Sequence, residues 1–297
     1  MHDIPGHSTW RSIEEQTLGW SSDRIFHIVD AQGQHLLLRT SDAAQHTSKH
    51  HEFQWTQHLA AQGIAMSQPL AFGLFDSGRQ VYSLLSWIEG QDGAHWVAER
   101  PAAACHELGL QAGRILQQIH SVAVPPGTEN AEQQMRALYL KKLEQYRSCG
   151  YQVAHEQDFL QFIEQHLHLL TDAPRVFLHG DYHLNNMIVG ADDQLSIIDF
   201  NRCRLGDPAR DFNRLALFSC NLSSDFARGQ IDGYCAGKAD PGFFTRMAFY
   251  VAFDTFFSVI WAMAFGEEQI HASLQRTQKV WEDFAGFSSV VPRWYGQ

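Results

Sequence analysis

One stretch of this 297-residue chain, residues 176–211, constrains the fold more than any other. It contains two short apolar runs, residues 187–189 and 195–198, which are separated by the sequence Gly-Ala-Asp-Asp at 190–193. Short apolar runs on either side of a segment rich in Gly and Asp are typical of a β-hairpin. The sequence therefore predicts a hairpin at this point of the chain.

Polar residues lie at the ends of this predicted hairpin. His179, Asp181 and Asn186 form the pattern H-x-D-x-x-x-x-N before the first strand, and Asp199 follows the second strand. Phosphoryl transfer needs a carboxylate that orients the acceptor hydroxyl and takes its proton, and it needs hard oxygen ligands for Mg²⁺. We expect Asp181 to be the base, and Asn186 and Asp199 to bind the metal, as in the protein-kinase catalytic loop and Asp-Phe-Gly element. The alternative is an ordinary hairpin with polar caps, but a chance match of all these residues at fixed spacings is rare.

These residues, with their neighbours, resemble the signature of the aminoglycoside phosphotransferase (APH-like) kinase family. The resemblance rests on His179-Gly180-Asp181, Asn186, Ile198-Asp199-Phe200, Gly206-Asp207-Pro208 and Asp211. It implies an α+β, two-lobed protein-kinase-like fold: a small N-terminal lobe with an antiparallel sheet and one helix, and a larger, mostly helical C-terminal lobe. It also implies that His179 and Asp211 support the catalytic loop. With weaker matches elsewhere, the resemblance covers nearly the whole chain, although Asn201 stands where protein kinases have the Gly of Asp-Phe-Gly.

The expected division is a nucleotide-binding lobe over residues 1–86, a hinge over 87–91 and a catalytic and acceptor-binding lobe over 92–297. Within the first lobe, residues 1–15 have the pattern of a short amphipathic helix and lead-in. Alternation of apolar residues predicts strands over 25–29, 35–39, 70–74 and 81–87, and helical spacing with a Ser cap predicts a helix over 48–62.

Two charged residues of the first lobe are candidates for nucleotide binding. Arg39 ends the second strand, where the kinase template has a Lys over the α- and β-phosphates, and it keeps the positive charge. A solvent-facing charge at the strand end is the alternative. Glu52 lies in the predicted helix, and the resemblance implies that it pairs with Arg39.

Main-chain groups of the same lobe are the other nucleotide candidates. Ser21 and Ser22 lie where a phosphate-covering loop is expected, although no G-x-G-x-x-G is present and an ordinary turn is the alternative. Leu85 and Trp87 lie where the chain approaches the hinge, and we expect their main chain to contact the adenine.

The second lobe is predicted to be mainly helical. Apolar residues at helical spacing predict helices over 106–121, 127–150, 155–171 and 212–220, and residues 221–297 are helical and rich in aromatic residues. In the resembling family, acidic side chains from this C-terminal region face amino sugars. The acceptor-binding candidates are therefore Asp225, Asp232, Asp254, Glu267 and Glu268.

Composition limits the partners and the compartment. The net charge of −11 argues against nucleic acid and against an anionic membrane surface, and is compatible with a cationic acceptor. Five cysteines without C-x-x-C spacing indicate reduced thiols, and no export signal is apparent, so we expect a cytoplasmic protein. The apolar residues 247–265 include Asp254 near their middle, which indicates a buried helix and not a membrane span.

The sequence therefore predicts an enzyme that uses Mg²⁺ to transfer the γ-phosphoryl group of ATP or GTP to a hydroxyl of a small molecule. The favoured acceptor is an aminoglycoside-type antibiotic or a related amino sugar, with antibiotic resistance as the implied role. A macrolide, a choline-like alcohol, an amino acid and a sugar are alternatives. A nucleotide-binding regulatory pseudokinase and, less favoured, a protein kinase also remain open, as does the oligomeric state.

Overall fold

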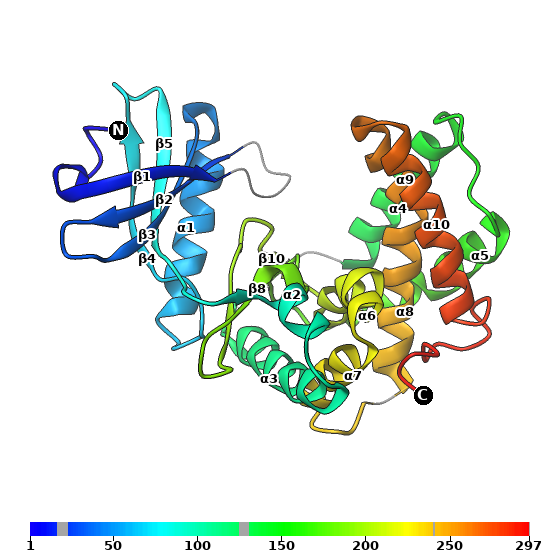
Figure 1. The fold of residues 1–297 in the computed structure, drawn as a ribbon. Helices are drawn as coiled ribbons and strands as arrows, with labels where there is room; N and C mark the ends of the chain where they lie inside the picture. Colours follow the sequence, from blue (N-terminus) through cyan, green and yellow to red (C-terminus); the bar gives the residue numbers. More distant parts are fainter. Residues whose placement is uncertain (17–22, 125–130, 240, 297) are drawn as a thin grey trace. The chain divides into compact units, whose positions relative to one another are not determined.

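The computed structural model describes residues 1–16, 23–124, 131–239 and 241–296 (Figure 1). The chain divides into two compact units. Unit 1 comprises Met1–Gly93 and Asn186–Cys203, and unit 2 comprises Ala94–Asn185 and Arg204–Gln297. The division expected from the sequence places residues 186–203 in the second lobe, whereas the structure groups them with unit 1.

Unit 1 is built on a five-stranded antiparallel sheet with the strand order β1-β2-β3-β5-β4 (Figure 1). The strands are β1 Trp10–Gln16, β2 Arg24–Asp30, β3 His35–Asp42, β4 Pro69–Phe75 and β5 Gln80–Ser86. The prediction of a helix over residues 1–15 is wrong, because β1 pairs with β2 from Trp10↔Asp30 to Gln16↔Ile25 after the short 3₁₀ turn η1, His7–Thr9. A polar edge strand with few apolar residues has no clear period of its own, so pairing with β2 decides its structure.

One long helix of unit 1, α1 His46–Ala60, packs against β4 and β5 (Figure 1). It follows the 3₁₀ turn η2, Ala43–Gln45, which begins where the Asp42 carboxylate accepts the backbone N–H of Ala44. The helix buries Phe53, Thr56 and Leu59. The sheet has its own apolar cluster of Ile4, Phe26, Ile28, Leu36, Leu38, Phe75, Tyr82 and Leu84.

The predicted hairpin is present. Its strands are β8 Met187–Val189 and β9 Leu195–Ile197, and they pair in the register Met187↔Ile197 and Val189↔Leu195. The short strand β6 Gln91–Asp92 pairs with β8, and the backbone N–H of Ile197 donates to the Ala65 carbonyl at 2.8 Å. These main-chain bonds explain why the hairpin belongs to unit 1.

Unit 2 is mainly helical. Its helices are α2 Gly93–Ala98, α3 Ala102–Ser121, α4 Ala131–Arg147, α5 Glu156–His166, α6 Cys220–Leu222, α7 Ser224–Tyr234, α8 Pro241–Phe256, α9 Ser258–Ala262 and α10 Glu267–Asp283. Shorter segments are the 3₁₀ turns η3 Leu167–Leu170, η4 Leu184–Asn186, η5 Pro208–Phe212 and η7 Met263–Phe265, the π-helical η6 Leu215–Ser219, and the paired strands β7 Val176–Leu178 and β10 Arg204–Gly206.

Helices α3 and α7 approach each other closely because glycines face across the contact. A Cβ atom on Gly109 of α3 would lie 2.2 Å from the carbonyl oxygen of Phe226, and one on Gly229 of α7 would lie 2.2 Å from that of His106. No side chain fits in such a space. The packing fixes the backbone of α3, to which the catalytic loop is attached as described below.

The apolar stretch of unit 2 forms α8 and α9, and most of the side chains of α8 are buried. Residues Pro241–Phe265 are the one helical stretch in the described part of the chain that is long and apolar enough to cross a membrane, and 61% of its most apolar window is buried. Phe249, Phe253 and Phe256 of α8 are fully buried. The stretch therefore contributes to the core of unit 2.

Candidate functional site

The residues expected to bind nucleotide and metal lie in unit 1, and the residues of the catalytic loop lie in unit 2. The first group comprises Arg39, Glu52, Leu85, Trp87, Asn186 and Asp199, and the second comprises His179, Asp181 and Asp211. Ser21 and Ser22 lie outside the described residues.

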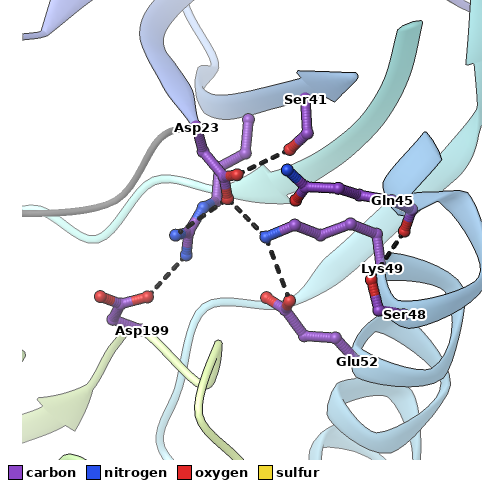
Figure 2. A network of polar contacts seen from close by, with 8 residues as sticks. Asp23, Ser41, Gln45, Ser48, Lys49, Glu52 and Asp199 are labelled. Carbon is purple, nitrogen blue, oxygen red and sulfur yellow. Dashed lines mark hydrogen bonds and ion pairs between the residues drawn. The ribbon is translucent and has the colours of Figure 1, made fainter. Parts of the chain in front are cut away.

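A network of five charged side chains lies between the sheet and α1 in unit 1 (Figure 2). Arg39 of β3 contacts two carboxylates: its Nη1 donates to Oδ1 of Asp199 at 2.6 Å, and its Nη2 lies 3.4 Å from Oδ2 of Asp23. Lys49 of α1 also contacts two, with Nζ at 2.6 Å from Asp23 Oδ2 and at 3.4 Å from Glu52 Oε2. Asp23, directly after the residues that are not described, therefore joins both cations.

The expected direct pairing of Glu52 with Arg39 is replaced by an indirect one. Among the described residues, the ion-pair partner of Glu52 is Lys49, one helical turn earlier in α1, and Lys49 connects Glu52 to Asp23. The charge of Glu52 still acts on Arg39, since it raises the pKa of that guanidinium. Arg39 and Glu52 are instead linked through Asp23 and Lys49.

The network is compact and largely closed to solvent. The Asp23 side chain is 2% exposed and the Arg39 side chain 10%, and the cavity among these side chains has a volume of about 10 Å³. Burial acts to raise the pKa of Asp23, but the hydrogen bonds from Lys49 and from Ser41 Oγ, at 2.6 and 2.7 Å, outweigh it and hold the pKa below its ordinary value. Asp23 is therefore ionised at neutral pH.

The two expected metal ligands start from adjacent positions of the hairpin. The backbone N–H of Ile198 donates to the carbonyl of Asn186 at 3.0 Å, so Asn186 lies opposite the residue that precedes Asp199. Asp199 has a left-handed backbone with φ of 64°, which is uncommon for a residue with a side chain, although Asp adopts it more readily than most. An amide oxygen and a carboxylate suit Mg²⁺, which binds one or two carboxylates together with substrate phosphates.

Some main-chain groups of the segment that leads to the predicted hinge are already bonded within the sheet. Leu85 lies in the central part of β5, opposite Leu37 of β3 and Pro69 of β4. The backbone N–H of Trp87 donates to the His35 carbonyl at 3.2 Å. The Trp87 N–H is therefore used within the sheet, and the contact of this segment with the adenine stays a prediction.

In unit 2, the catalytic loop is attached to a buried carboxylate. The backbone N–H groups of His179 and Gly180 donate to the two oxygens of Asp211, both at 2.8 Å, and Nε2 of His120 lies 3.1 Å from Oδ2. Burial acts to raise the pKa of Asp211, but His120 and the Gly180 N–H outweigh it and lower that pKa. Gly180 has φ of 83°, a conformation that a side chain would strain. This arrangement is the loop support that we expect of Asp211.

Further bonds attach the same loop to the helices. The hydroxyl of the fully buried Tyr182 donates to the Ala112 carbonyl of α3 at 2.7 Å, and the backbone N–H of Leu184 donates to Oγ of Ser219 at 3.2 Å. The His179 side chain is buried, with Nδ1 at 3.2 Å from the backbone nitrogen of Asp181. The loop is therefore held at four points around Asp181.

Two nitrogen-bearing side chains lie beside the carboxylate of Asp181. Nε of Arg214 is 3.0 Å from Oδ1, and Nε2 of His183 is 3.6 Å from the same atom. Arg214 directly precedes η6, so the α-helix predicted over residues 212–220 is instead a π-helical turn followed by the short α6. Single π turns inside helices are frequent at functional sites.

The five expected acceptor carboxylates are spread over unit 2, and four of them have separate partners. Asp225 pairs with Arg228 at 2.6 Å. Asp232 accepts the Tyr295 hydroxyl at 2.8 Å, and Glu267 accepts the Tyr151 hydroxyl, also at 2.8 Å. Asp254 lies 3.7 Å from Arg210 and accepts a hydrogen bond from Asn213. Glu268 is exposed at the start of α10.

Sequence reasoning missed three charged residues that the structure brings to these sites: Asp23, Lys49 and Arg214. Two of them follow a simple spacing, since Lys49 precedes Glu52 by three residues and Arg214 follows Asp211 by three, which are one-turn separations on a helix. Asp23 has no such signal, because its partners come from β3 and α1.

Comparison with known proteins gives one family match that covers most of the chain. Residues 12–248 match the family APH, described as "Phosphotransferase enzyme family". The matched segment contains the hairpin, the loop around Asp181, Asp211 and the charged network of unit 1.

Solved structures with the same fold cover nearly the whole chain at low sequence identity. A wild-type aminoglycoside 2′-phosphotransferase-IIIa in complex with GDP is 18% identical, with a TM-score of 0.71 over 94% of this chain and 95% of that one. A choline/ethanolamine kinase family protein from Mesorhizobium loti is 17% identical, with a TM-score of 0.68 over 96% and 94%. An amicoumacin kinase in complex with AMP-PNP and Ca²⁺ is 14% identical, with a TM-score of 0.65 over 94% and 90%. At these identities the similarity establishes the protein-kinase-like fold.

Proposed function

We propose that this chain, which belongs to the APH phosphotransferase enzyme family, transfers the γ-phosphoryl group of ATP or GTP to a hydroxyl of a small molecule. The observation that carries this proposal is the loop around Asp181. Its backbone is fixed by the buried carboxylate of Asp211, and it leads within five residues to Asn186 at the start of the hairpin. The order base, amide ligand and carboxylate ligand suits in-line phosphoryl transfer.

In this proposal, Asn186 and Asp199 hold Mg²⁺ through their side-chain oxygens. Held by these two residues, the ion would supply positive charge against the charge that develops on the transferred phosphoryl group. Among the described residues no group of three His, Cys, Asp or Glu side chains forms a metal site, and Mg²⁺ that binds together with substrate phosphates would need only one or two protein carboxylates.

Arg39 binds the α- and β-phosphates. In the structure its guanidinium is bound to Asp199 and Asp23, so the carboxylates neutralise it until a nucleotide is present. Phosphate oxygens are suitable replacements because guanidinium binds carboxylates and phosphates with the same planar geometry. AMP-PNP in the amicoumacin kinase and GDP in the aminoglycoside phosphotransferase support a nucleotide in this fold.

Asp181 takes the proton of the acceptor hydroxyl. The hydroxyl oxygen bonds to the γ-phosphorus, the bond between that phosphorus and the β,γ-bridging oxygen breaks, and the nucleoside diphosphate leaves. The carboxylate is 17% exposed, so it is accessible to an acceptor while the loop that carries it stays fixed.

The acceptor favoured by the sequence, an aminoglycoside or amino sugar, remains a prediction. Names of the similar structures include aminoglycoside, choline/ethanolamine and amicoumacin kinases, which differ in acceptor. The regulatory pseudokinase is the second candidate, because both cations of the nucleotide network are already paired with carboxylates. Absence of transfer to any acceptor, with intact nucleotide binding, would favour it.

The test is a coupled assay of ADP release with Mg·ATP or Mg·GTP across acceptors of different charge, with Asp181→Asn as the inactive control. We expect one acceptor class to stimulate release in the wild type and not in the variant. Equal stimulation in both proteins would contradict the role of Asp181.

A further inference from the structure

The side chains next to Asp181 form a cationic cluster around one aromatic ring. Phe218 of η6 has the guanidinium carbon of Arg214 at 5.6 Å and that of Arg276, from α10, at 5.0 Å from its ring centroid. The ring of His183 lies 5.7 Å from the same centroid. Three segments of unit 2 therefore bring groups that are or can become cationic to one place beside the catalytic carboxylate.

This cluster has fewer carboxylates than cations. In the described part of the chain, the carboxylate paired with Arg214 is Asp181 itself, and Arg276 has no carboxylate within ion-pair distance. Burial lowers the pKa of Arg276, and the nearby charge of Arg214 lowers it further. Both guanidinium groups lie against the same ring and are close enough for the charge of one to act on the other, which costs free energy unless an anion offsets it.

A third arginine, Arg210, lies near this cluster in the chain and has a guanidinium donor without an acceptor in the described part of the protein. Arg210, one turn before Arg214, lies 3.7 Å from Asp254 and stacks at 5.5 Å on the ring of Tyr250. The Nε atom of Arg210 is buried and has no hydrogen-bond acceptor among the described residues, whereas Nε of Arg214 lies 3.0 Å from the Asp181 carboxylate. Buried donors in native proteins are nearly always bonded, so unused guanidinium donors indicate an absent acceptor group.

The expected carboxylates for an amino-sugar acceptor do not offset these charges. Of the five candidates, Asp254 is the one that contacts an arginine of this group, Arg210, and Asn213 also donates to it. Asp225, Asp232 and Glu267 are bonded to other side chains. A polycationic acceptor next to Asp181 would therefore meet Arg214 and Arg276.

We propose that the acceptor carries an oxyanion, a carboxylate or a phosphate, in addition to its hydroxyl, and that Arg214 and Arg276 bind it. The proposal rests on the proposed phosphotransferase function and specifies its substrate class. Guanidinium groups bind both kinds of oxyanion through paired hydrogen bonds. When the oxyanion takes the place of Asp181 on Arg214, the carboxylate becomes free to accept the hydroxyl proton. Binding of the correct acceptor would thus also release the base.

The first arm of the test compares alcohols that differ in charge. The acceptors are D-glycerate, glycerol 3-phosphate and L-homoserine as oxyanion carriers, glycerol as the neutral analogue, and choline and kanamycin as cations. We expect ADP release to be stimulated by an oxyanion carrier and not by glycerol, choline or kanamycin. D-glycerate and glycerol 3-phosphate then distinguish a carboxylate from a phosphate. Stimulation by a cation with no response to any oxyanion carrier would overturn the proposal.

The second arm uses Arg276→Gln, because Arg276 does not contact Asp181. Loss of one charge-assisted contact should raise the KM of the active oxyanion acceptor by about 10- to 100-fold, with a much smaller change in kcat. Arg228→Gln, a matched arginine of unit 2 that is paired with Asp225, should leave that KM unchanged. If Arg276→Gln and the wild type have the same KM, Arg276 does not bind the oxyanion. Titration with Mg·ATP serves as the control that each variant is folded.

The third arm does not depend on turnover. Malonate has two carboxylates and no hydroxyl, so it can occupy the cluster and cannot be phosphorylated. Calorimetry should detect malonate binding in the wild type and in Arg228→Gln, and a loss of about 10-fold or more in affinity in Arg276→Gln. The oxyanion proposal is overturned if the wild type does not bind malonate, or if Arg276→Gln binds it as tightly as the wild type does. Failure of the wild type to bind Mg·ATP would overturn the proposed function instead, and the malonate result would still test the anion site.

Discussion

The two charged clusters of this protein differ in their balance of charge. In unit 1, the cations Arg39 and Lys49 meet the three carboxylates Asp23, Glu52 and Asp199. In unit 2, Arg214 and Arg276 share the ring of Phe218, and among the described residues Asp181 is paired with Arg214 while Arg276 has no carboxylate partner. The first cluster has an excess of negative charge, and the second an excess of positive charge.

The difference indicates which ligand each cluster requires. An excess carboxylate, Asp199, favours a divalent cation, which would neutralise it and release Arg39 for phosphates. An excess guanidinium favours an anion. A cationic acceptor follows from the family name and from the overall charge of −11, but the charge that matters for binding is the local one.

Removing the catalytic carboxylate should have the largest effect. Asp181→Asn keeps the size of the side chain but cannot take a proton, so turnover should fall by about 10²–10⁴-fold while nucleotide affinity is preserved. Single-turnover kinetics and a separate nucleotide titration measure the two quantities. The control is Asp283→Asn, which removes a carboxylate paired with Lys279 on α10 and should keep full turnover. If Asp181→Asn also keeps full turnover, Asp181 is not the base.

The unit 1 network should lose stability when its central carboxylate is removed. Asp23→Asn leaves Arg39 and Lys49 without their shared partner, and we expect the free energy of unfolding to fall by about 3 kcal/mol at pH 7. Denaturant titration measures this change. Asp76→Asn, which disrupts an exposed ion pair with Arg79, should have a much smaller effect.

The pH dependence of this loss follows from the lowered pKa of Asp23. A carboxyl whose pKa is lower in the folded state contributes stability above its unfolded pKa of 3.8, and that contribution disappears as the pH falls through the folded value. The gap between wild type and Asp23→Asn should therefore be constant from pH 7 to pH 5 and close below about pH 4. A gap that does not narrow as the pH falls below 3.8 would show that packing, and not charge, is responsible.

Removing the phosphate-binding cation should affect the nucleotide and not the acceptor. Arg39→Gln should raise the KM for Mg·ATP by about 10- to 100-fold, because one charged contact to the phosphates is lost. Arg39→Lys keeps the charge and should lie between wild type and Arg39→Gln. A rise in acceptor KM of the same size would contradict the separate roles of the two clusters.

The smallest effect is expected from the ring that orients the guanidinium groups. Phe218→Leu preserves apolar volume but removes the cation–π contacts, which contribute about 0.5–1 kcal/mol each at partly exposed sites. The acceptor KM should rise by roughly two- to fivefold. The control is Phe265→Leu, whose ring lies against that of Trp261, and it should not change the acceptor KM. A fall in kcat in Phe218→Leu without a change in KM would count against an acceptor role of Phe218.

The hairpin and the places of the candidate base and metal ligands in it were predictable, because the residues concerned are close together in sequence. The hairpin, Asp181, Asn186 and Asp199 lie within 19 positions of one another, so local strand and turn propensities give their order. The predicted direct contact between Arg39 and Glu52 is absent among the described residues, and Lys49 is the cation paired with Glu52. The expected N-terminal helix failed because β1 is an edge strand whose structure is decided by pairing with β2.

The sequence by itself determined the fold class, the family and the base and metal-ligand candidates, because short-range patterns of apolar and polar residues encode a hairpin and its ends. The tertiary structure decided which charges meet. Asp23 contacts Arg39 and Lys49, and Arg276 approaches Arg214 from a helix more than 60 positions later in the chain. Electrostatic interactions depend on distance and burial and not on sequence separation, so the balance of charge at each cluster, and with it the acceptor class, is a property of the folded chain.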